Sequence, residues 1–263
     1  MLGYFQALNF AEKSQRLRNW FDSSGGVSIL KAEQRSLDCT LQRIFGYYAC
    51  QVSVAEGLDM LDNCPVGYHF SLIDTPTESN CLSAIACDAN FWPINPGSLD
   101  LILLHHVLDI ADSPHRLLIE AAKSIMPEGK LVVLGFNPCS LSGVGSWLIP
   151  ERIKAFKGVK FINTRRLRDW LNLLGFNIEQ ITYGSYVNPL GSFFKKDSEE
   201  VIEKHCAQWR LPFGSFYSIL ATKEAHCMTS VRQSWLKVGN NMMGQPVARS
   251  RANCFGENIE SAR

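Results

Sequence analysis

The pattern of hydrophobic and polar residues is clearest in the middle of the chain, where it predicts a strand, a helix and a second strand. Residues 99–104 are almost all apolar, which is typical of a parallel strand buried on both faces. Ser113 and Pro114 suit the N-cap and first turn of a helix. Its apolar stripe, which ends before Pro127, is Leu117, Leu118, Ala121, Ala122 and Ile125. Residues 130–136 are the second apolar run, so the unit reads as a right-handed parallel crossover of a doubly wound α/β sheet.

Weaker patterns predict the other elements. Amphipathic helices are expected at 10–21 and from about 29 to 44, and the Ser-Ser-Gly-Gly sequence at 23–26 ends the first of them. The remaining expectations are helices at 54–61, 164–174 and 195–209 and strands at 68–73, 83–87, 176–183 and 216–222. The chain beyond residue 223 is polar and irregular, which predicts a disordered tail at 224–263. We therefore expect an N-terminal helical extension at 1–45 and one central α/β domain at 46–223.

Composition excludes several classes of protein. The chain has 263 residues, of which 46% are hydrophobic, so it can bury one sizeable core. The net charge of +1 gives no general argument for binding nucleic acid or a membrane surface. Nine scattered cysteines without a Cys-x-x-Cys pair indicate neither a disulfide framework nor a zinc site. No leader pattern or membrane-length apolar run is present, so we expect a cytoplasmic protein.

A family resemblance lies in the same central stretch. Asp88-Ala89, Pro93, Ser98 and Asp100 follow the Asp-Ala-x-x-Leu-Pro-Phe-x-x-x-Ser-Phe-Asp pattern of class I S-adenosylmethionine-dependent methyltransferases. The family's Glu-x-x-Arg-x-x-x-Pro-Gly-Gly segment is matched by Glu120, Lys123, Pro127 and Gly129, with Glu128 in place of the first glycine. The sequence Gly-Phe-Asn-Pro at 135–138, followed by Ser140 and Leu141, resembles the bacterial YafS-like group of this class.

The resemblance implies a fold, a cofactor and a reaction. It implies a three-layer, Rossmann-like, seven-stranded sheet of order 3-2-1-4-5-7-6, mostly parallel with an antiparallel strand at its edge. It also implies S-adenosylmethionine as cofactor and methyl transfer to an unidentified small-molecule acceptor. Such a displacement at a sulfonium methyl needs alignment and exclusion of water more than acid–base chemistry. We therefore expect few catalytic side chains.

The cofactor loop departs from the family pattern. On the family's acid-x-Gly-x-Gly-x-Gly sequence, this chain has Gln51, Ser53, Ala55 and Gly57, so only the last glycine remains. The glycines allow backbone conformations and close ligand approach that a side chain resists. Replacing the acid by Gln51 would remove a charged contact to the cofactor's ammonium group, although an amide oxygen can still accept a hydrogen bond. This loop supports a rival hypothesis, a catalytically degenerate methyltransferase-like binding or regulatory protein with weak or no cofactor binding. A nucleotide-dependent oxidoreductase is disfavoured because Gly-x-Gly-x-x-Gly is missing.

Further positions take cofactor roles by resemblance. Asp74, 21 residues after Ser53, suits a ribose contact, although an Asp before Thr75-Pro76 is also a common turn residue. Asp88 and the backbone at Ala89 fall where the family contacts adenine. Asp100 is expected to be structural. The predicted cofactor set is Gln51, Ser53, Ala55, Gly57, Asp74, Asp88, Ala89 and His105.

Two histidines end the predicted fourth strand. His105 and His106 would border the cofactor site, with His106 lining the pocket and a candidate catalytic base. Adjacent residues of a strand point to opposite faces, so the two cannot chelate a metal ion without a bend, and we predict no metal. Asp109 is placed either at a family acid position or in a local turn role. Asn137-Pro138 follows the fifth strand and lacks the second proline and aromatic of the Asn-Pro-Pro-Tyr motif, so we reject that motif.

A basic segment follows at 152–168. It contains Arg152, Lys154, Lys157, Lys160, Arg165, Arg166 and Arg168 and no acid. It could bind an anionic acceptor, although a solvated helix face is the ordinary explanation. Nucleic acid is disfavoured because no series of aromatic residues accompanies the charges.

Overall fold

The sheet has the predicted topology. The computed structural model describes residues 10–54, 58–73, 83–87, 91–140, 156–186 and 213–225. Seven strands pair in the order β3-β2-β1-β4-β5-β7-β6, and β7 runs antiparallel to both β5 and β6. The strands are β1 (Gly46–Ser53), β2 (Val66–Ile73), β3 (Ala84–Ala86), β4 (Leu99–His105), β5 (Ile125–Phe136), β6 (Phe176–Gly184) and β7 (Phe216–Lys223). The predicted order and the antiparallel pairing at the edge are confirmed.

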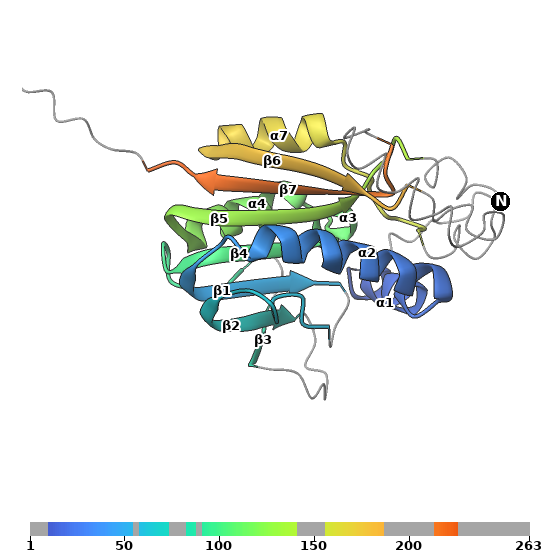
Figure 1. Ribbon diagram of the computed structural model, residues 1–263, viewed down its shortest axis with the longest axis horizontal. Coiled ribbons are helices and arrows are strands. Elements are labelled where there is room, and N and C mark those ends of the chain that lie inside the picture. The colour runs from blue at the N-terminus through green and yellow to red at the C-terminus, as the bar shows by residue number, and fades with distance from the viewer. Residues whose placement is uncertain are drawn as a thin grey trace, which may run out of the picture. The chain divides into compact units, whose positions relative to one another are not determined.

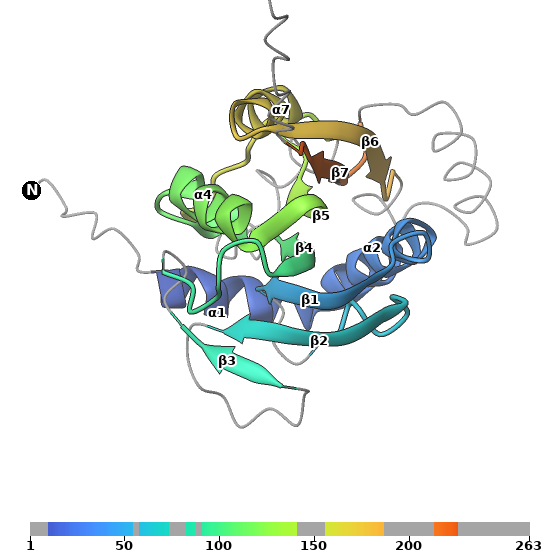
Figure 2. The ribbon, with the colours of Figure 1, turned by 90° about the vertical axis from the view of Figure 1, so that its left-hand side faces the viewer.

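Helices cover both faces of this sheet (Figures 1 and 2). They are α1 (Phe10–Phe21), α2 (Ser24–Leu41), α3 (Val107–Ile110), α4 (Pro114–Ser124) and α7 (Thr164–Leu173). The larger apolar cluster joins α1, α4 and α7 to one face, and the smaller cluster joins α2 to the other. Figure 2 shows α4 and α2 on opposite sides of the sheet. The described part of the chain is therefore a three-layer α/β fold with its core on both faces.

The joint between α1 and α2 is tighter than predicted. The segment 23–26 does end α1, but it also begins α2: Ser23 is the N-cap and its Oγ accepts from the Gly26 N–H at 3.2 Å. A Cβ on Gly26 would lie 2.3 Å from the Trp20 carbonyl oxygen, so only glycine allows the two helices to approach this closely. The second helix accordingly runs from Ser24 to Leu41 instead of 29–44.

The connection from β1 to β2 contains no helix among the residues described. The predicted helix at 54–61 is wrong for residues 58–61, which are irregular. Met60 and Leu61 instead pack in the smaller cluster with Leu37 and Leu41 of α2. Thus α2 covers a face that a first crossover helix would cover, and Figure 1 shows it in front of the sheet between β5 and β1.

The strand ends fix where a site can form. β5 begins at Ile125, directly after α4 and five residues before the predicted start, because its first residue already pairs with Leu99 across a register shift. At the amino end of β4, the Asp100 carboxylate accepts from the Tyr47 and Tyr48 N–H groups, both at 2.9 Å. The predicted structural role of Asp100 is confirmed.

The expected helix at 195–209 lies outside the described residues, as does nearly all of the expected tail. Among described helices, none has the length and apolar character of a membrane span.

Candidate functional site

The carboxyl ends of β1, β2, β3 and β4 meet at one edge of the sheet, where α/β folds bind ligands. Ser53 at the end of β1 pairs with His105 at the end of β4. A small cavity lies beside them, lined among others by Ser53, Ile73 and Cys87 from the strand ends and by Phe10 and Ser14 of α1. Its volume is about 20 Å³. This is space for about one water molecule, and α1 lies against the strand ends here through Phe10 and Ser14.

Gln51 has a different role from the predicted one. The residue is 3% exposed. Its Nε2 donates to the Leu58 carbonyl at 2.6 Å, and its Oε1 accepts from the Met60 N–H at 2.9 Å. Both ends of the amide therefore hold the irregular crossover against β1, and Gln51 does not line the cavity described above.

His105 connects the cavity to a buried acid. Its Nδ1 lies 2.8 Å from Ser53 Oγ, and its Nε2 lies 3.0 Å from Glu33 Oε2. A carboxylate can only accept, so Nε2 carries the hydrogen and Nδ1 accepts from the Ser53 hydroxyl. His105 thus stands one hydrogen bond behind the cavity and does not line it.

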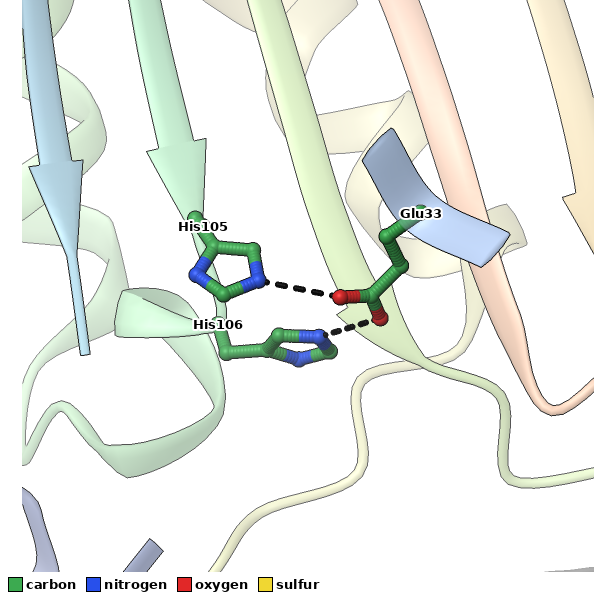
Figure 3. A group of neighbouring side chains, drawn as sticks. All are labelled: Glu33, His105 and His106. Atoms are coloured by element: carbon green, nitrogen blue, oxygen red, sulfur yellow. Dashed lines mark hydrogen bonds and ion pairs between the residues drawn. The ribbon is translucent and has the colours of Figure 1, made fainter. Parts of the chain in front are cut away.

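His106 turns back onto the same acid. Its φ of 55° is left-handed, which is uncommon for a residue other than glycine. Because of this bend, its Nε2 lies 2.8 Å from Glu33 Oε1, while its Nδ1 lies 3.0 Å from Asp109 Oδ2. Figure 3 shows both imidazoles directed at the Glu33 carboxylate. The expectation that the two histidines point apart therefore fails, because β4 ends at His105.

Asp109 is held from a second side. Its Oδ2 also accepts from the Phe136 N–H at the end of β5, at 3.0 Å. Its Oδ1 is buried and has no hydrogen-bond partner in the described chain. Asp109 thus links α3 to β5 instead of serving an exposed turn.

The four ionisable side chains are fully buried and shift one another's pKa values. Burial by itself would raise the pKa of Glu33, but His106 and His105 outweigh it and lower that pKa. Burial lowers the pKa of His105. For His106 burial would do the same, but Glu33 and Asp109 prevail and raise its pKa. Burial raises the pKa of Asp109 against the opposing effect of His106. His106, which lies between the two carboxyl groups, is therefore the imidazole that holds a proton more strongly.

Aromatic rings enclose His106. Phe136 stacks on the imidazole with ring centroids 3.8 Å apart, and the Phe21 ring is 5.5 Å away. The residue has no exposed surface, and both nitrogens are engaged. His106 therefore does not line a pocket, and this conformation gives it no access to a methyl acceptor.

Sequence reasoning missed Glu33. A signal was present, because Glu33 stands in the apolar stripe of α2, four residues after Ile29 and four before Leu37. An acid in such a stripe needs a buried partner. Of the remaining predicted cofactor residues, Ala55, Gly57, Asp74, Asp88 and Ala89 all lie outside the described residues.

A second hollow lies near the ends of β5 and β6. Its volume is about 610 Å³, and its lining includes Asn137, Arg165, Arg168, Tyr183 and Phe213. The Asn137 amide is engaged locally, since its Nδ2 donates to the Gly214 carbonyl and its Oδ1 accepts from the Cys139 N–H. This agrees with rejecting the Asn-Pro-Pro-Tyr motif.

The basic segment is divided by its contacts. Lys160 Nζ donates to the Asp112 carbonyl at 2.9 Å, and the Arg166 guanidinium lies 5.0 Å from the Trp170 ring centroid. Arg165 and Arg168 instead line the hollow. Arg152 and Lys154 lie outside the described residues.

Solved structures share this architecture. An S-adenosylmethionine-dependent methyltransferase from Thermotoga maritima, described as a possible histamine N-methyltransferase, superposes with a TM-score of 0.57 at 18% identity, covering 82% of this chain and 100% of that chain. One from Archaeoglobus fulgidus gives a TM-score of 0.55 at 15% identity, covering 78% and 97%. The fold is that of the class I methyltransferases.

The sequence comparisons are narrower. The uncharacterized protein YafS of Escherichia coli K12 is 28% identical over 161 residues. The match covers 60% of this chain and 65% of YafS, so it spans less than two thirds of that relative. No protein-family model matches. The methyltransferase-like chain thus resembles the YafS-like group, as the central motifs predicted.

Proposed function

We propose that this protein is an S-adenosylmethionine-dependent methyltransferase that acts on a small-molecule acceptor. The observation that carries the proposal is the carboxyl edge of the sheet, where Ser53, Ile73 and Cys87 surround a cavity at the position where this fold binds ligands. The cofactor would supply an electrophilic methyl group. The chain would supply Ser53 there, and the other cofactor contacts would be Ala55, Gly57, Asp74, Asp88 and Ala89. Gln51 is left out of this set because its amide holds the crossover.

The cavity lies where this fold binds its cofactor, but its volume is too small to hold the cofactor. Pockets for ligands of this size occupy roughly 300–1,000 Å³, whereas the cavity measures about 20 Å³. Phe10 and Ser14 of α1 line one side of the cavity. Cofactor binding would therefore need a wider space between α1 and the strand ends.

The acceptor is proposed to carry a negative charge. The hollow of about 610 Å³ is large enough for a small molecule and is lined by Arg165 and Arg168. Two guanidinium groups would bind a carboxylate or phosphate through paired N–H donors. Because methyl transfer chiefly needs alignment, holding the acceptor by such a group is a sufficient role for this hollow.

A second candidate function is a methyltransferase-like protein that binds or regulates a partner without using the cofactor. The specific observations for it are the small cavity and the crossover, in which the described residues form no helix after β1. A crossover helix would direct its N-terminal N–H groups at the ligand. Because residues 58–61 are irregular, such a helix does not extend through them, and we expect weaker cofactor binding for this second function.

Calorimetric titration of the full chain with S-adenosylmethionine and S-adenosylhomocysteine separates these functions. A methyltransferase should bind both ligands, and Asp88→Ala should weaken binding at least tenfold. Asp62→Ala removes an exposed carboxylate elsewhere and is the matched control, expected to bind as the parent does. Failure of both ligands to bind at millimolar concentration would exclude the enzyme and favour the second function.

A further inference from the structure

We propose that Glu33, His105 and His106 form a binding site for a divalent transition-metal ion of the zinc type. The proposal goes beyond the methyltransferase function and does not depend on cofactor binding. It assigns the buried cluster as a structural metal site that fastens α2 to the end of β4.

Three side chains from distant parts of the sequence converge in this cluster. Glu33 is 72 and 73 positions from the two histidines, yet its carboxylate oxygens lie 3.0 Å from His105 Nε2 and 2.8 Å from His106 Nε2. The three side chains place one donor atom each within 4.8 Å of the others. This convergence depends on the left-handed backbone of His106, a conformation that persists only where the surrounding structure fixes it.

The donor spacing suits a small ion after a slight expansion. Zinc binds imidazole nitrogen and carboxylate oxygen at about 2.0–2.2 Å. At tetrahedral angles these bonds separate neighbouring donors by about 3.3 Å. The two imidazole nitrogens lie 3.0 and 2.8 Å from different oxygens of Glu33. One donor atom from each of the three residues lies within 4.8 Å of the others, so side-chain rotations would bring the three donors around one ion.

Each imidazole has a hydrogen-bond partner at Nδ1, on the side of the ring away from Glu33. A histidine that binds a metal through one ring nitrogen is usually fixed through the other, often by a carboxylate. Here Asp109 Oδ2 stands 3.0 Å from His106 Nδ1, and Ser53 Oγ stands 2.8 Å from His105 Nδ1. Asp109 is itself fixed by the Phe136 N–H. With a metal ion at Nε2, His105 would carry its hydrogen on Nδ1 and donate it to Ser53 Oγ, which reverses that hydrogen bond. Both Nε2 atoms face the Glu33 carboxylate, one toward each oxygen.

The cluster contains two buried carboxyl groups. Glu33 and Asp109 are 0% exposed, and their ion pairs in the described chain involve only histidine, with no Lys or Arg. Asp109 Oδ1 moreover has no hydrogen-bond partner there, which is rare for a buried carboxylate oxygen. A protonated His106 lies between these carboxylates but carries only one positive charge, and a buried charge left without compensation is costly. One divalent cation with two neutral imidazoles would neutralise them both.

The donor set indicates the kind of ion. Two imidazoles and one carboxylate favour zinc and neighbouring transition metals, whereas calcium and magnesium prefer oxygen ligands alone. The aromatic rings of Phe21 and Phe136 exclude bulk water from the cluster. The three side chains supply three of the four ligands that zinc takes in structural sites. Their buried setting suits a structural role, since the free energy of binding then stabilises the fold.

The test uses the untagged full-length protein, stripped with a chelator and titrated with Zn²⁺ alone. We expect one ion per chain by calorimetry and by elemental analysis. Glu33→Gln keeps the shape but loses the charge and should weaken binding by more than about 100-fold, and Asp109→Asn should weaken it about 10–100-fold. The control is His69→Asn, which removes a partly exposed imidazole 2.8 Å from Asp59. It should leave the affinity unchanged.

Substitution with Co²⁺ identifies the ligands without any variant. The nine cysteines are the competing ligands, and bound thiolate gives cobalt an intense charge-transfer band. A d–d spectrum of nitrogen and oxygen ligands without that band is expected. Absence of stoichiometric binding by the parent, a thiolate band, or unchanged affinity in a folded Glu33→Gln protein would each overturn the proposal. None of these outcomes bears on whether S-adenosylmethionine binds.

Discussion

Restoring the family's acid at position 51 distinguishes the role that the sequence suggested for this residue from the role that the structure gives it. If the side chain faced the cofactor, Gln51→Glu would tighten binding of S-adenosylmethionine by returning a carboxylate to its ammonium group. In the structure, Gln51 Nε2 donates to the Leu58 carbonyl at 2.6 Å. A carboxylate cannot donate, so the substitution removes this bond and places two acceptors against each other. We therefore expect a loss of stability and no gain in affinity.

The magnitude follows from the lost bond. Leaving a buried partner unsatisfied costs about 1–3 kcal/mol. For a unit of this size, such a loss lowers the melting temperature by about 2–12 °C. The contact from the Met60 N–H to Oε1 at 2.9 Å survives the change, which keeps the cost within this range.

The loss should depend on pH with a definite sign. Burial without a cation raises the pKa of the introduced carboxyl group above its unfolded value of about 4.3. Between the two pKa values the folded state binds more protons, so the variant loses stability as pH rises. Below the unfolded pKa the protonated acid can donate to Leu58, and the difference from the parent should nearly vanish. A loss of about 1–3 kcal/mol corresponds to a shift of about 1–2 pKa units.

Urea denaturation followed by tryptophan fluorescence at pH 4 and pH 8 measures this difference, because only the lower pH lies below the unfolded pKa. Gln15→Glu is the matched control, since Gln15 donates to Asn19 on the exposed face of α1. It should change stability by less than about 0.5 kcal/mol at either pH. Parental stability of Gln51→Glu at pH 8, together with tighter cofactor binding, would refute the reasoning and return Gln51 to the ligand site.

Two further substitutions test the packing around the site. Gly26→Ala should destabilise the protein by about 1–3 kcal/mol, because the new Cβ would lie 2.3 Å from the Trp20 carbonyl oxygen. The control in the same thermal melts is Gly67→Ala, whose new Cβ would have its nearest atom at 3.4 Å. Equal losses of stability in the two variants would contradict the close approach of α1 and α2. Tyr217→Phe should be neutral or slightly stabilising, because the buried hydroxyl has no hydrogen-bond partner in the described chain. Tyr186→Phe loses a hydrogen bond to the Tyr183 carbonyl at 3.2 Å and should cost about 1 kcal/mol of stability. If urea titrations showed the larger loss of stability for Tyr217→Phe, the Tyr217 hydroxyl would have a hydrogen-bond partner.

The sequence by itself determined the elements whose burial is continuous. Residues 99–104 and 130–136 form strands wherever they lie in a core, because unbroken apolar runs leave no face for water. The first helix was predicted with its exact bounds, 10–21, since its amphipathic period and its end are local properties. The resemblance carried by Asp88, Ser98 and Asp100 supplied the strand order, which periodicity cannot give.

The tertiary structure decided everything that depends on partners distant in sequence. Alignment with the family's loop pattern predicts Gln51 as a cofactor ligand. In the structure its amide instead hydrogen-bonds Leu58 and Met60, because residues 58–61 of the crossover are irregular. Helix propensity for that segment yields to the packing of Met60 against α2, which illustrates why local preference is a weak guide. The region of the proposed cofactor contact at Ser53 was predictable, but the closeness of α1 was not.

The buried cluster shows the same division most clearly. Adjacent histidines at the end of a strand were visible in the sequence, and strand alternation predicted that they point apart. One left-handed residue, His106, reverses that prediction and directs both rings at Glu33 on a helix more than 70 positions earlier. The sequence lists the ionisable groups, but their pairing requires the backbone bend and the packing of α2. The physical reason is that buried charges are stable only with their partners, and the fold alone brings those partners together.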